Sequence, residues 1–223
     1  MEKLREIIDL KTLVQEVNFI KKRGWYKEDV NFWLSFNIGA SILEEFNVYP
    51  IEYYNMIKED NNSFDKITIR NKQMYGYFDK NGLIYKIYQP SQKNYKFIKV
   101  RPYTQGLDQL VYKKPNLIIC SSLKDAMCLR QFNFNVEVIA PDSENTMIKP
   151  YVINNLKNKF KKIITLFDND QAGHTAINKY LLHYNIHGTY LELEKDLSDA
   201  VKKHGINKIK KTIAPLLSKT IKK

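Results

Sequence analysis

The chain has 223 residues, and its 36 Lys and Arg residues outnumber its 24 Asp and Glu residues, which gives a net charge of +12 at pH 7. A composition of 43% hydrophobic and 27% charged residues excludes a disordered chain, and no apolar run approaches the ~18 residues needed to span a bilayer. The charged N-terminus lacks a secretion signal, so we expect a cytoplasmic protein with no membrane partner. The basic charge favours an anionic partner such as nucleic acid, although an AT-rich coding sequence would produce the same lysines.

Residues 1–60 are predicted to form a helical N-terminal segment. Apolar residues recur at helical spacing from Leu4 to Ile20, and Gly24 is a suitable end for that helix. Pro50 prevents any later helix from continuing past it. Two more short helices are predicted at about 27–36 and 41–46, and a loop is predicted at 61–63.

Residues 61–112 are predicted to contain a small antiparallel sheet. Aromatic and β-branched runs at 74–78 and 83–88 flank Asp79-Lys-Asn-Gly82, and Asn-Gly tolerates the positive φ of a hairpin turn. A third strand is expected over 95–100.

Residues 113–205 alternate between strand and helix patterns, which predicts an α/β fold with a parallel sheet and crossover helices. A lysine-rich tail without acidic residues is expected over 206–223. The strands are predicted at 117–120, 136–139, 163–167 and 188–191, and the helices at 123–132, 150–160 and 171–184.

Two carboxylates, Asp168 and Asp170, directly follow the strand predicted at 163–167. Ligands of open α/β sheets bind at the carboxyl ends of the strands. Side chains two residues apart in extended chain point the same way, so these carboxylates could share one Mg²⁺ or Mn²⁺ ion and present it to phosphate. For an isolated pair, a turn with an Asp helix cap is the better explanation.

The pair is not isolated, because Asp196 and Asp199 follow the next predicted strand. Parallel strands bring all four carboxylates to one rim, and a divalent metal relieves the repulsion between them. One of Asp196 and Asp199 could instead cap a helix. Asp125, near the start of the helix at 123–132, is either a fifth ligand or a simple cap.

Together these stretches resemble the Toprim domain of bacterial-type DNA primases, topoisomerases and related nucleases. The family pattern is strand-Glu-Gly-x-x-Asp, strand-Asp-x-Asp-x-Ala-Gly and Lys-Asp-x-x-Asp, and the matching stretches are Leu117-Ile-Ile-Cys-Ser-Ser-Leu-Lys-Asp125, Phe167-Asp-Asn-Asp-Gln-Ala-Gly173 and Lys195-Asp-Leu-Ser-Asp199. The resemblance implies a Rossmann-like parallel sheet and a Mg²⁺ or Mn²⁺ cofactor. The metal ligands that it implies are Asp168, Asp170, Asp196, Asp199 and Asp125.

The preceding part resembles the catalytic core of phage and organellar primase-helicases, on residues 36–50, 84–90, 96–97 and 106–110. That resemblance implies a primase-like RNA polymerase subdomain, with single-stranded DNA and ribonucleoside triphosphates as its partners. Cys120 and Cys128 cannot supply the zinc ligands of such primases and are expected to be buried, and no helicase P-loop is present. We therefore expect a separate replicative helicase or zinc-binding module as a further partner.

The first motif departs from the family at Ser121, which stands where the family has a Glu that acts in acid–base chemistry or metal binding. Serine neither titrates nor adds negative charge, so that mechanism lacks a part. Glu144 or Asp142, which follow the second strand at the same rim, could take the vacated place, although a surface loop is the commoner setting for a Glu.

Basic residues alternate with aromatic residues between Tyr85 and Tyr103. Strand alternation places Lys86 and Tyr88 on one face, where lysines would neutralise phosphates and rings would stack on bases. An ordinary strand with lysine outside and tyrosine inside explains the tyrosines individually, but a lysine cluster beside an acidic rim favours binding. The predicted nucleic-acid or nucleotide contacts are Lys86, Lys96, Lys99, Arg101 and Lys124.

These features predict a DNA primase-like nucleotidyltransferase of phage type, which makes RNA primers on single-stranded DNA during replication. The alternatives are a Toprim nuclease and a degenerate Toprim scaffold that binds nucleic acid or a helicase. Ser121 favours the scaffold, the basic and aromatic part before the rim favours synthesis over cleavage, and clustered carboxylates bring a pure scaffold no benefit. The predicted catalytic residues are Asp168, Asp170, Glu144 and Ser121.

Overall fold

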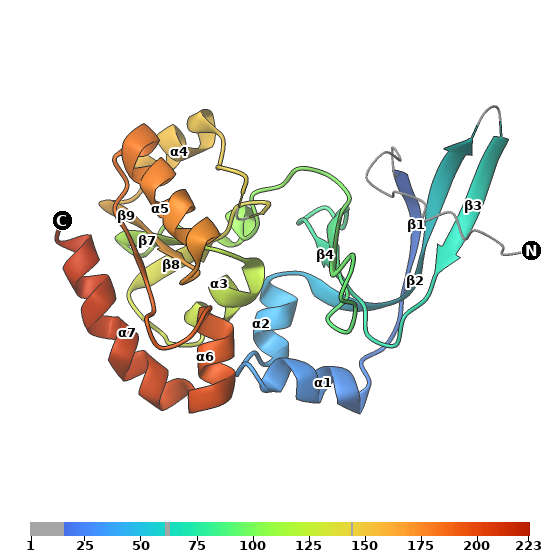
Figure 1. The fold of residues 1–223 in the computed structure, drawn as a ribbon, viewed down its shortest axis with the longest axis horizontal. Helices are drawn as coiled ribbons and strands as arrows, with labels where there is room; N and C mark the ends of the chain where they lie inside the picture. Colours follow the sequence, from blue (N-terminus) through green and yellow to red (C-terminus); the bar gives the residue numbers. More distant parts are fainter. Residues whose placement is uncertain (1–15, 61–62, 144) are drawn as a thin grey trace, which may run out of the picture.

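The computed structural model describes residues 16–60, 63–143 and 145–223. An antiparallel sheet forms the N-terminal half of the molecule and a parallel sheet forms the C-terminal half, and the chain runs from the first to the second once (Figure 1). None of the helices in these described ranges is long and apolar enough to cross a membrane.

The antiparallel sheet is built around one long strand, β2. Its first three residues pair with β4, its middle pairs with β1, and its outer half pairs with β3, so that β1–β3 project as an arm (Figure 1). The predicted hairpin is confirmed, because β4 and β5 pair across a turn in which Gly82 has φ of +77°. The strands are β1 (Glu16–Lys22), β2 (Val48–Asp60), β3 (Ser63–Ile69), β4 (Tyr75–Phe78), β5 (Ile84–Tyr88) and β6 (Phe97–Lys99).

The prediction of a helical segment over 1–60 is wrong at 16–22, which form strand β1, and at 48–60, which form strand β2. Val17 and Ile20 pack against the core on one face of the antiparallel sheet, and β1 pairs with backbone groups of β2 that would otherwise have no partner. Residues 1–15 of that prediction, and 61–62 of the predicted loop, lie outside the described residues. The short helices are confirmed as α1 (Lys27–Leu34) and α2 (Ala40–Glu45).

The parallel sheet confirms the α/β prediction. Its strand order is β10-β9-β7-β8, and all its pairs are parallel. Successive strands are joined by crossover helices at the predicted places. The elements are β7 (Asn116–Cys120), α3 (Leu123–Arg130), β8 (Val136–Ile139), α4 (Pro150–Lys157), β9 (Lys162–Phe167), α5 (Gln171–Tyr184) and β10 (Gly188–Tyr190).

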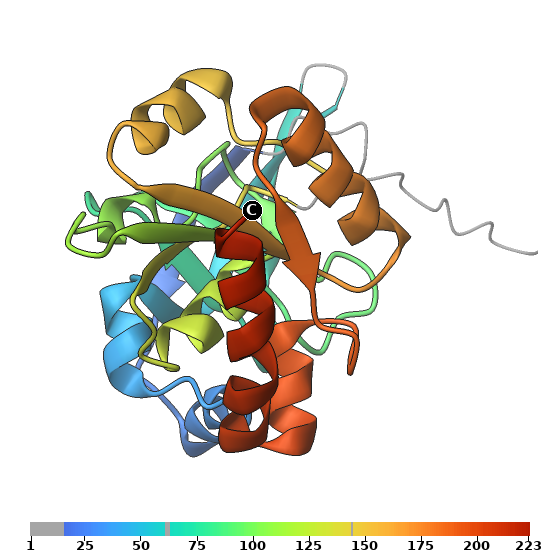
Figure 2. The ribbon, with the colours of Figure 1, turned by 90° about the vertical axis from the view of Figure 1, so that its left-hand side faces the viewer.

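Helices cover both faces of this sheet (Figure 2). α4 and α5 pack over Leu117 and Ile119, whereas α3, α6 (Leu197–His204) and α7 (Ile206–Ile221) pack over Ile118 and Cys120. Both cysteines are fully buried, as predicted.

The lysine-rich C-terminal tail is the helix α7. Ile209, Ile213 and Leu217 recur every four residues and are buried against the sheet, while the lysines lie on the exposed side. Pro215 inside the helix and the high density of lysines hide this periodicity in the sequence.

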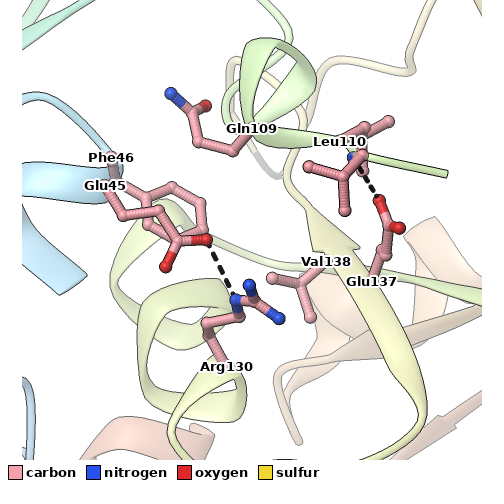
Figure 3. Close-up of a pocket in the computed structure, with 8 residues that line it drawn as sticks. Glu45, Phe46, Gln109, Leu110, Arg130, Glu137 and Val138 are labelled. Atoms are coloured by element: carbon pink, nitrogen blue, oxygen red, sulfur yellow. Dashed lines mark hydrogen bonds and ion pairs between the residues drawn. The ribbon is translucent and has the colours of Figure 1, made fainter. Parts of the chain in front are cut away.

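The two sheets share a core and are joined at its edge. One continuous cluster runs from Trp33 and Tyr77 in the N-terminal half to Ile118 and Ile213 in the C-terminal half. Figure 3 shows where the two halves meet beside this cluster, around a hollow of about 10 Å³. There Arg130 Nε donates to Glu45 Oε1 at 3.0 Å.

The buried Glu137 completes this joint. Its carboxylate accepts the backbone N–H groups of Val111 and Lys113 at 2.9 Å each, and thereby fixes the segment that leads from one sheet to the other. The relative position of the two sheets is thus set by packing and by buried hydrogen bonds.

Candidate functional site

A cleft of about 560 Å³ lies between the carboxyl ends of the parallel strands and the face of β4–β6. We call one side the acidic wall, formed by Asp125, Asp168, Asp196 and Asp199, and the other the basic wall, formed by Lys86, Tyr88, Lys96, Phe97 and Lys99. The predicted acidic rim and the predicted lysine and aromatic cluster therefore face one another.

The cleft opens at the switch point of the parallel sheet. β7 and β9 are neighbours, but the chain leaves β7 toward β8 on one side and β9 toward β10 on the other. Ser121 and Asp168, which follow these two strands, both line the cleft. This is the position at which open α/β sheets bind ligands.

Asp168 and Asp170 differ in their surroundings, although they are two residues apart. Asp168 lines the cleft, whereas Asp170 is the N-cap of α5 and lies outside the lining. Asp170 accepts the N–H of Gly173 at 2.9 Å and lies 2.8 Å from Nζ of Lys195. The Lys195 ammonium and the Gly173 N–H together lower the pKa of the Asp170 carboxyl.

Gly173 is required at the start of α5 because the helix and the end of β9 lie in close contact. A Cβ atom at this position would lie 2.1 Å from the carbonyl oxygen of Asp168. The backbone N–H of Asn169 also donates to the carbonyl of Lys195 at 2.7 Å, which ties the loop after β9 to the segment before α6. The position of Asp168 is therefore fixed by the backbone.

Asp196 and Asp125 bring the first turns of α6 and α3 together. Asp196 is the N-cap of α6 and accepts the N–H of Asp199 at 2.6 Å. Asp125 is buried and accepts hydrogen bonds from the N–H and hydroxyl of Ser198, at 3.0 and 2.7 Å, and from the Ser122 hydroxyl at 2.6 Å. Burial raises the pKa of the Asp125 carboxyl, and the negative charge of the nearby Asp196 raises it further.

Lys124 is a cation within the acidic wall. Its Nζ lies 3.5 Å from Asp199 Oδ1 and 3.9 Å from Asp196 Oδ2. Burial acts to lower the pKa of Lys124, but the carboxylates of Asp125 and Asp196 outweigh it and raise that pKa above its usual value. The side chain stays charged and pairs with the acidic wall, rather than extending from it as a separate phosphate contact.

The basic wall presents two cross-strand pairs of β5 and β6, Lys86 with Lys99 and Tyr88 with Phe97. The two rings are stacked with centroids 4.7 Å apart. Lys86 is buried, which lowers the pKa of its ammonium to about 8. As predicted from strand alternation, Lys86 and Tyr88 share the face that lines the cleft.

Asp142 lies where the two walls meet. Lys99 Nζ is 2.5 Å from its carboxylate, and Lys86 donates to its backbone carbonyl. The carboxylate that could have replaced the Glu at Ser121 is thus already paired with a lysine of the opposite wall. Glu144, the other candidate, lies outside the described residues.

Arg101 is the predicted contact that the structure places elsewhere. Its guanidinium lies 2.5 Å from Asp79 and donates to the carbonyl of Ile84 at 3.2 Å, so it stabilises the β4–β5 turn and does not line the cleft. Lys86, Lys96, Lys99 and Lys124 do line it.

The donor set suits a hard divalent cation, but the carboxylates do not form a preassembled cage. Within residues 16–60, 63–143 and 145–223, no three Asp, Glu, His or Cys side chains are placed to hold one metal ion. Mg²⁺ commonly takes one or two carboxylates and completes its shell with water and substrate phosphates. Asp168 lines the cleft and fits that mode. Asp196 and Asp199 pair with Lys124.

Two contributors to the cleft escaped the sequence analysis. The Ser122–Asp125 hydrogen bonds form a capping pattern, Ser-x-x-Asp, which could have been recognised locally. The buried ring of Phe36 lies behind the cleft lining, with its centre 4.4 Å from Lys124 Nζ; it comes from the N-terminal half of the molecule, so no local signal places it there.

Residues 118–201 match the family model described as Toprim-like. The zinc-binding and RNA polymerase domains of the Aquifex aeolicus primase superpose with a TM-score of 0.59 at 15% identity, over 85% of this chain and 56% of that one. The primase fragment of the bacteriophage T7 primase-helicase protein superposes with a TM-score of 0.52 at 13% identity, over 86% of this chain and 80% of that one. A search of curated proteins found no match.

Residues 118–201 are therefore similar to Toprim-like domains, and the chain has the fold of these primase domains. It spans just over half the length of the Aquifex chain.

Proposed function

We propose that the chain is a primase-like nucleotidyltransferase that binds single-stranded DNA and ribonucleoside triphosphates in the cleft and joins the ribonucleotides into an RNA primer. The observation that carries this proposal is the cleft itself, in which an acidic wall at the switch point of a Toprim-like sheet faces a basic and aromatic wall. The acidic wall would hold the metal ion used in phosphoryl transfer, and the basic and aromatic wall would bind the phosphates and bases of a single-stranded template. We assign 61–112 to the polymerase-type subdomain and 113–205 to the Toprim part.

Asp168 would hold a Mg²⁺ or Mn²⁺ ion together with phosphate oxygens of the nucleotide. The bound ion would neutralise charge at the reacting phosphate. In the reaction, the 3′-hydroxyl oxygen of the primer forms a bond to the α-phosphorus, the bond to pyrophosphate breaks, and the hydroxyl proton leaves to solvent. Asp170 would act indirectly, because its hydrogen bond at the start of α5 positions the loop that carries Asp168.

Lys86, Lys96 and Lys99 would neutralise phosphates of the template or the triphosphate. The ring of Phe97 is 47% exposed and backed by Tyr88, which makes it a suitable surface for stacking a base.

The test is to incubate the protein with single-stranded DNA, four labelled ribonucleotides and Mg²⁺ or Mn²⁺. Short labelled RNA products that depend on the DNA and fall at least 100-fold in Asp168→Asn would support the proposal. Thermal unfolding checks that the variant is folded, and Asp108→Asn, a carboxylate outside the cleft lining, is the matched control. Products that Asp168→Asn makes as well as the native protein does would refute the proposed role, and shortened DNA would identify a nuclease.

A scaffold that binds nucleic acid or a helicase is the second candidate, and Ser121 favours it because a neutral hydroxyl stands at the end of β7, on the cleft. Under this reading the protein would bind single-stranded DNA but incorporate no nucleotide with either metal.

We further propose a phage-type replication setting with a separate helicase. Addition of a zinc-binding primase module in trans would test whether priming depends on that module.

A further inference from the structure

Lys124 lies beside two carboxylates of the acidic wall, Asp196 and Asp199. Its Nζ is 3.5 Å from Asp199 Oδ1 and 3.9 Å from Asp196 Oδ2, and only 13% of its side chain is exposed. The second Asp196 oxygen is used inside the protein, because it accepts the Asp199 N–H and the Ser198 hydroxyl. Lys124 therefore contacts one oxygen of each aspartate, Asp196 Oδ2 and Asp199 Oδ1.

The helix that carries Lys124 does not account for this position. Lys124 is in the first turn of α3, where the helix dipole disfavours a cation. Its ammonium instead lies 4.4 Å from the centre of the Phe36 ring, which is a favourable cation–π distance. Tertiary contacts with α6 and with the N-terminal half therefore hold the charge in place.

We propose that Lys124 supplies, as a fixed side chain, the positive charge that a second divalent cation would bring to Asp196 and Asp199, so that the acidic wall holds one Mg²⁺ or Mn²⁺ ion, at Asp168. This inference rests on the proposed metal-dependent nucleotidyl transfer and restricts it to a one-ion site. A dication placed between the same two carboxylates would lie against the ammonium, and like charges at that distance repel strongly in a partly buried site.

Charge balance supports the same conclusion. Asp196 and Asp199 carry two negative charges, and Lys124 leaves this pair with one, which weakens the attraction for a further dication. The expectation that Asp196 and Asp199 are metal ligands is thus replaced by their pairing with Lys124.

The experiment counts bound Mn²⁺ per chain by electron paramagnetic resonance at saturating Mn²⁺, without nucleotide. The native protein is expected to bind one ion, and Lys124→Met is expected to bind two. The second ion should disappear again in Lys124→Met/Asp199→Asn. Lys124→Arg keeps the charge and should stay at one ion.

Lys202→Met is the matched control, because Lys202 also lies over the Phe36 ring, at 5.1 Å, but is exposed and on the outer side of α6. It removes the same charge from the same region and should leave the count at one. Thermal unfolding of each variant confirms that the fold is retained, and Lys124→Gln provides a second neutral replacement if Lys124→Met unfolds.

A native protein that binds two ions, with one lost in Asp199→Asn, would overturn the inference. So would a folded Lys124→Met or Lys124→Gln that still binds only as many ions as the native protein. Failure of the proposed function gives a different result. If Asp168→Asn binds as many ions as the native protein while Lys124→Met gains one, the metal site at Asp168 is refuted and the role of Lys124 stands.

Discussion

On the acidic wall the aspartates are fixed by backbone and helix ends, whereas on the basic wall the lysines extend from two strands. Asp196 caps α6 and Asp125 links the first turns of α3 and α6, while Asp170, next to this wall, caps α5. Lys86 and Lys99 instead reach across the cleft toward Asp142. Asp125 and Asp196 therefore give the acidic wall charge and also hold its helices, whereas the lysines of the basic wall pair with Asp142 and cap no helix.

This difference predicts that changes to the acidic wall mainly reduce stability and that changes to the basic wall mainly reduce binding.

The largest effect is expected for Gly173→Ala, because its Cβ would lie 2.1 Å from the backbone oxygen of Asp168. The helix must move away from β9, at a cost of about 3 kcal/mol in the free energy of unfolding. Urea denaturation measures it, and Gly24→Ala, with nothing within 4 Å of the added atom, is the control. Equal stability of the two variants would contradict the close contact.

Asp125→Ala should follow, with a loss of about 2 kcal/mol, because it leaves the buried N–H of Ser198 without its acceptor, although the Ser198 hydroxyl keeps Asp196 as a partner. The same urea measurement applies. Asp199→Ala is the comparison, since its side chain is 55% exposed, and it should cost less than 1 kcal/mol. If the two variants lose the same stability, Asp125 is not the link between the helices.

Asp170→Ala should cost about 1 kcal/mol, the usual effect of losing an Asp helix cap. Because the pKa of Asp170 is lowered in the folded protein, its contribution is present at neutral pH and is lost as the pH falls below about 4 toward the lowered folded-state value. The free energies of unfolding of the variant and the native protein, measured from unfolding curves at both pH values, should therefore differ less at pH 3 than at pH 7. A gap that widens at pH 3 would contradict the cap.

The smallest effect concerns Lys86 on the basic wall. Its pKa is lowered to about 8, so its ammonium is charged at pH 7 and loses its proton as the pH rises through that value. The affinity for short single-stranded DNA should fall about fivefold between pH 7 and pH 9, equivalent to about 1 kcal/mol. Fluorescence anisotropy measures this fall, which Lys86→Met should abolish.

Lys96→Met tests whether that pH dependence belongs to Lys86. Lys96 is an exposed lysine of the same wall, so its loss should weaken binding at both pH values and leave the pH dependence intact. If Lys96→Met abolishes the fall, or if Lys86→Met retains it, the buried ammonium is not its source.

The antiparallel sheet shows where sequence patterns were insufficient. The hairpin of β4 and β5 was predictable because Asn81-Gly82 and the alternating runs beside it are local signals. Strand β1 was not, because Val17 and Ile20 are three residues apart, which fits a helix and not a regular strand. An irregularity between Val17 and Phe19 in the pairing with β2 lets both side chains pack against one core.

The site shows the same limit at the level of side chains. That Asp168 lies at the carboxyl edge of the parallel sheet could be predicted, since it follows from the order of strands and helices. That Arg101 stabilises a turn, and that Lys124 pairs with the acidic wall, could not, because those orientations depend on partners brought together by the fold.

The sequence by itself determined the parallel α/β half, the carboxylates at its edge and the lysine and aromatic character of the strands before it. Each of these depends on short-range periodicity, turn chemistry or residue order. Only the tertiary structure decided that the two sheets enclose one cleft and that Lys124 meets Asp199, 75 residues along the chain. The physical reason is that burial and charge pairing act between residues close in space, and no local pattern encodes which distant side chains will meet.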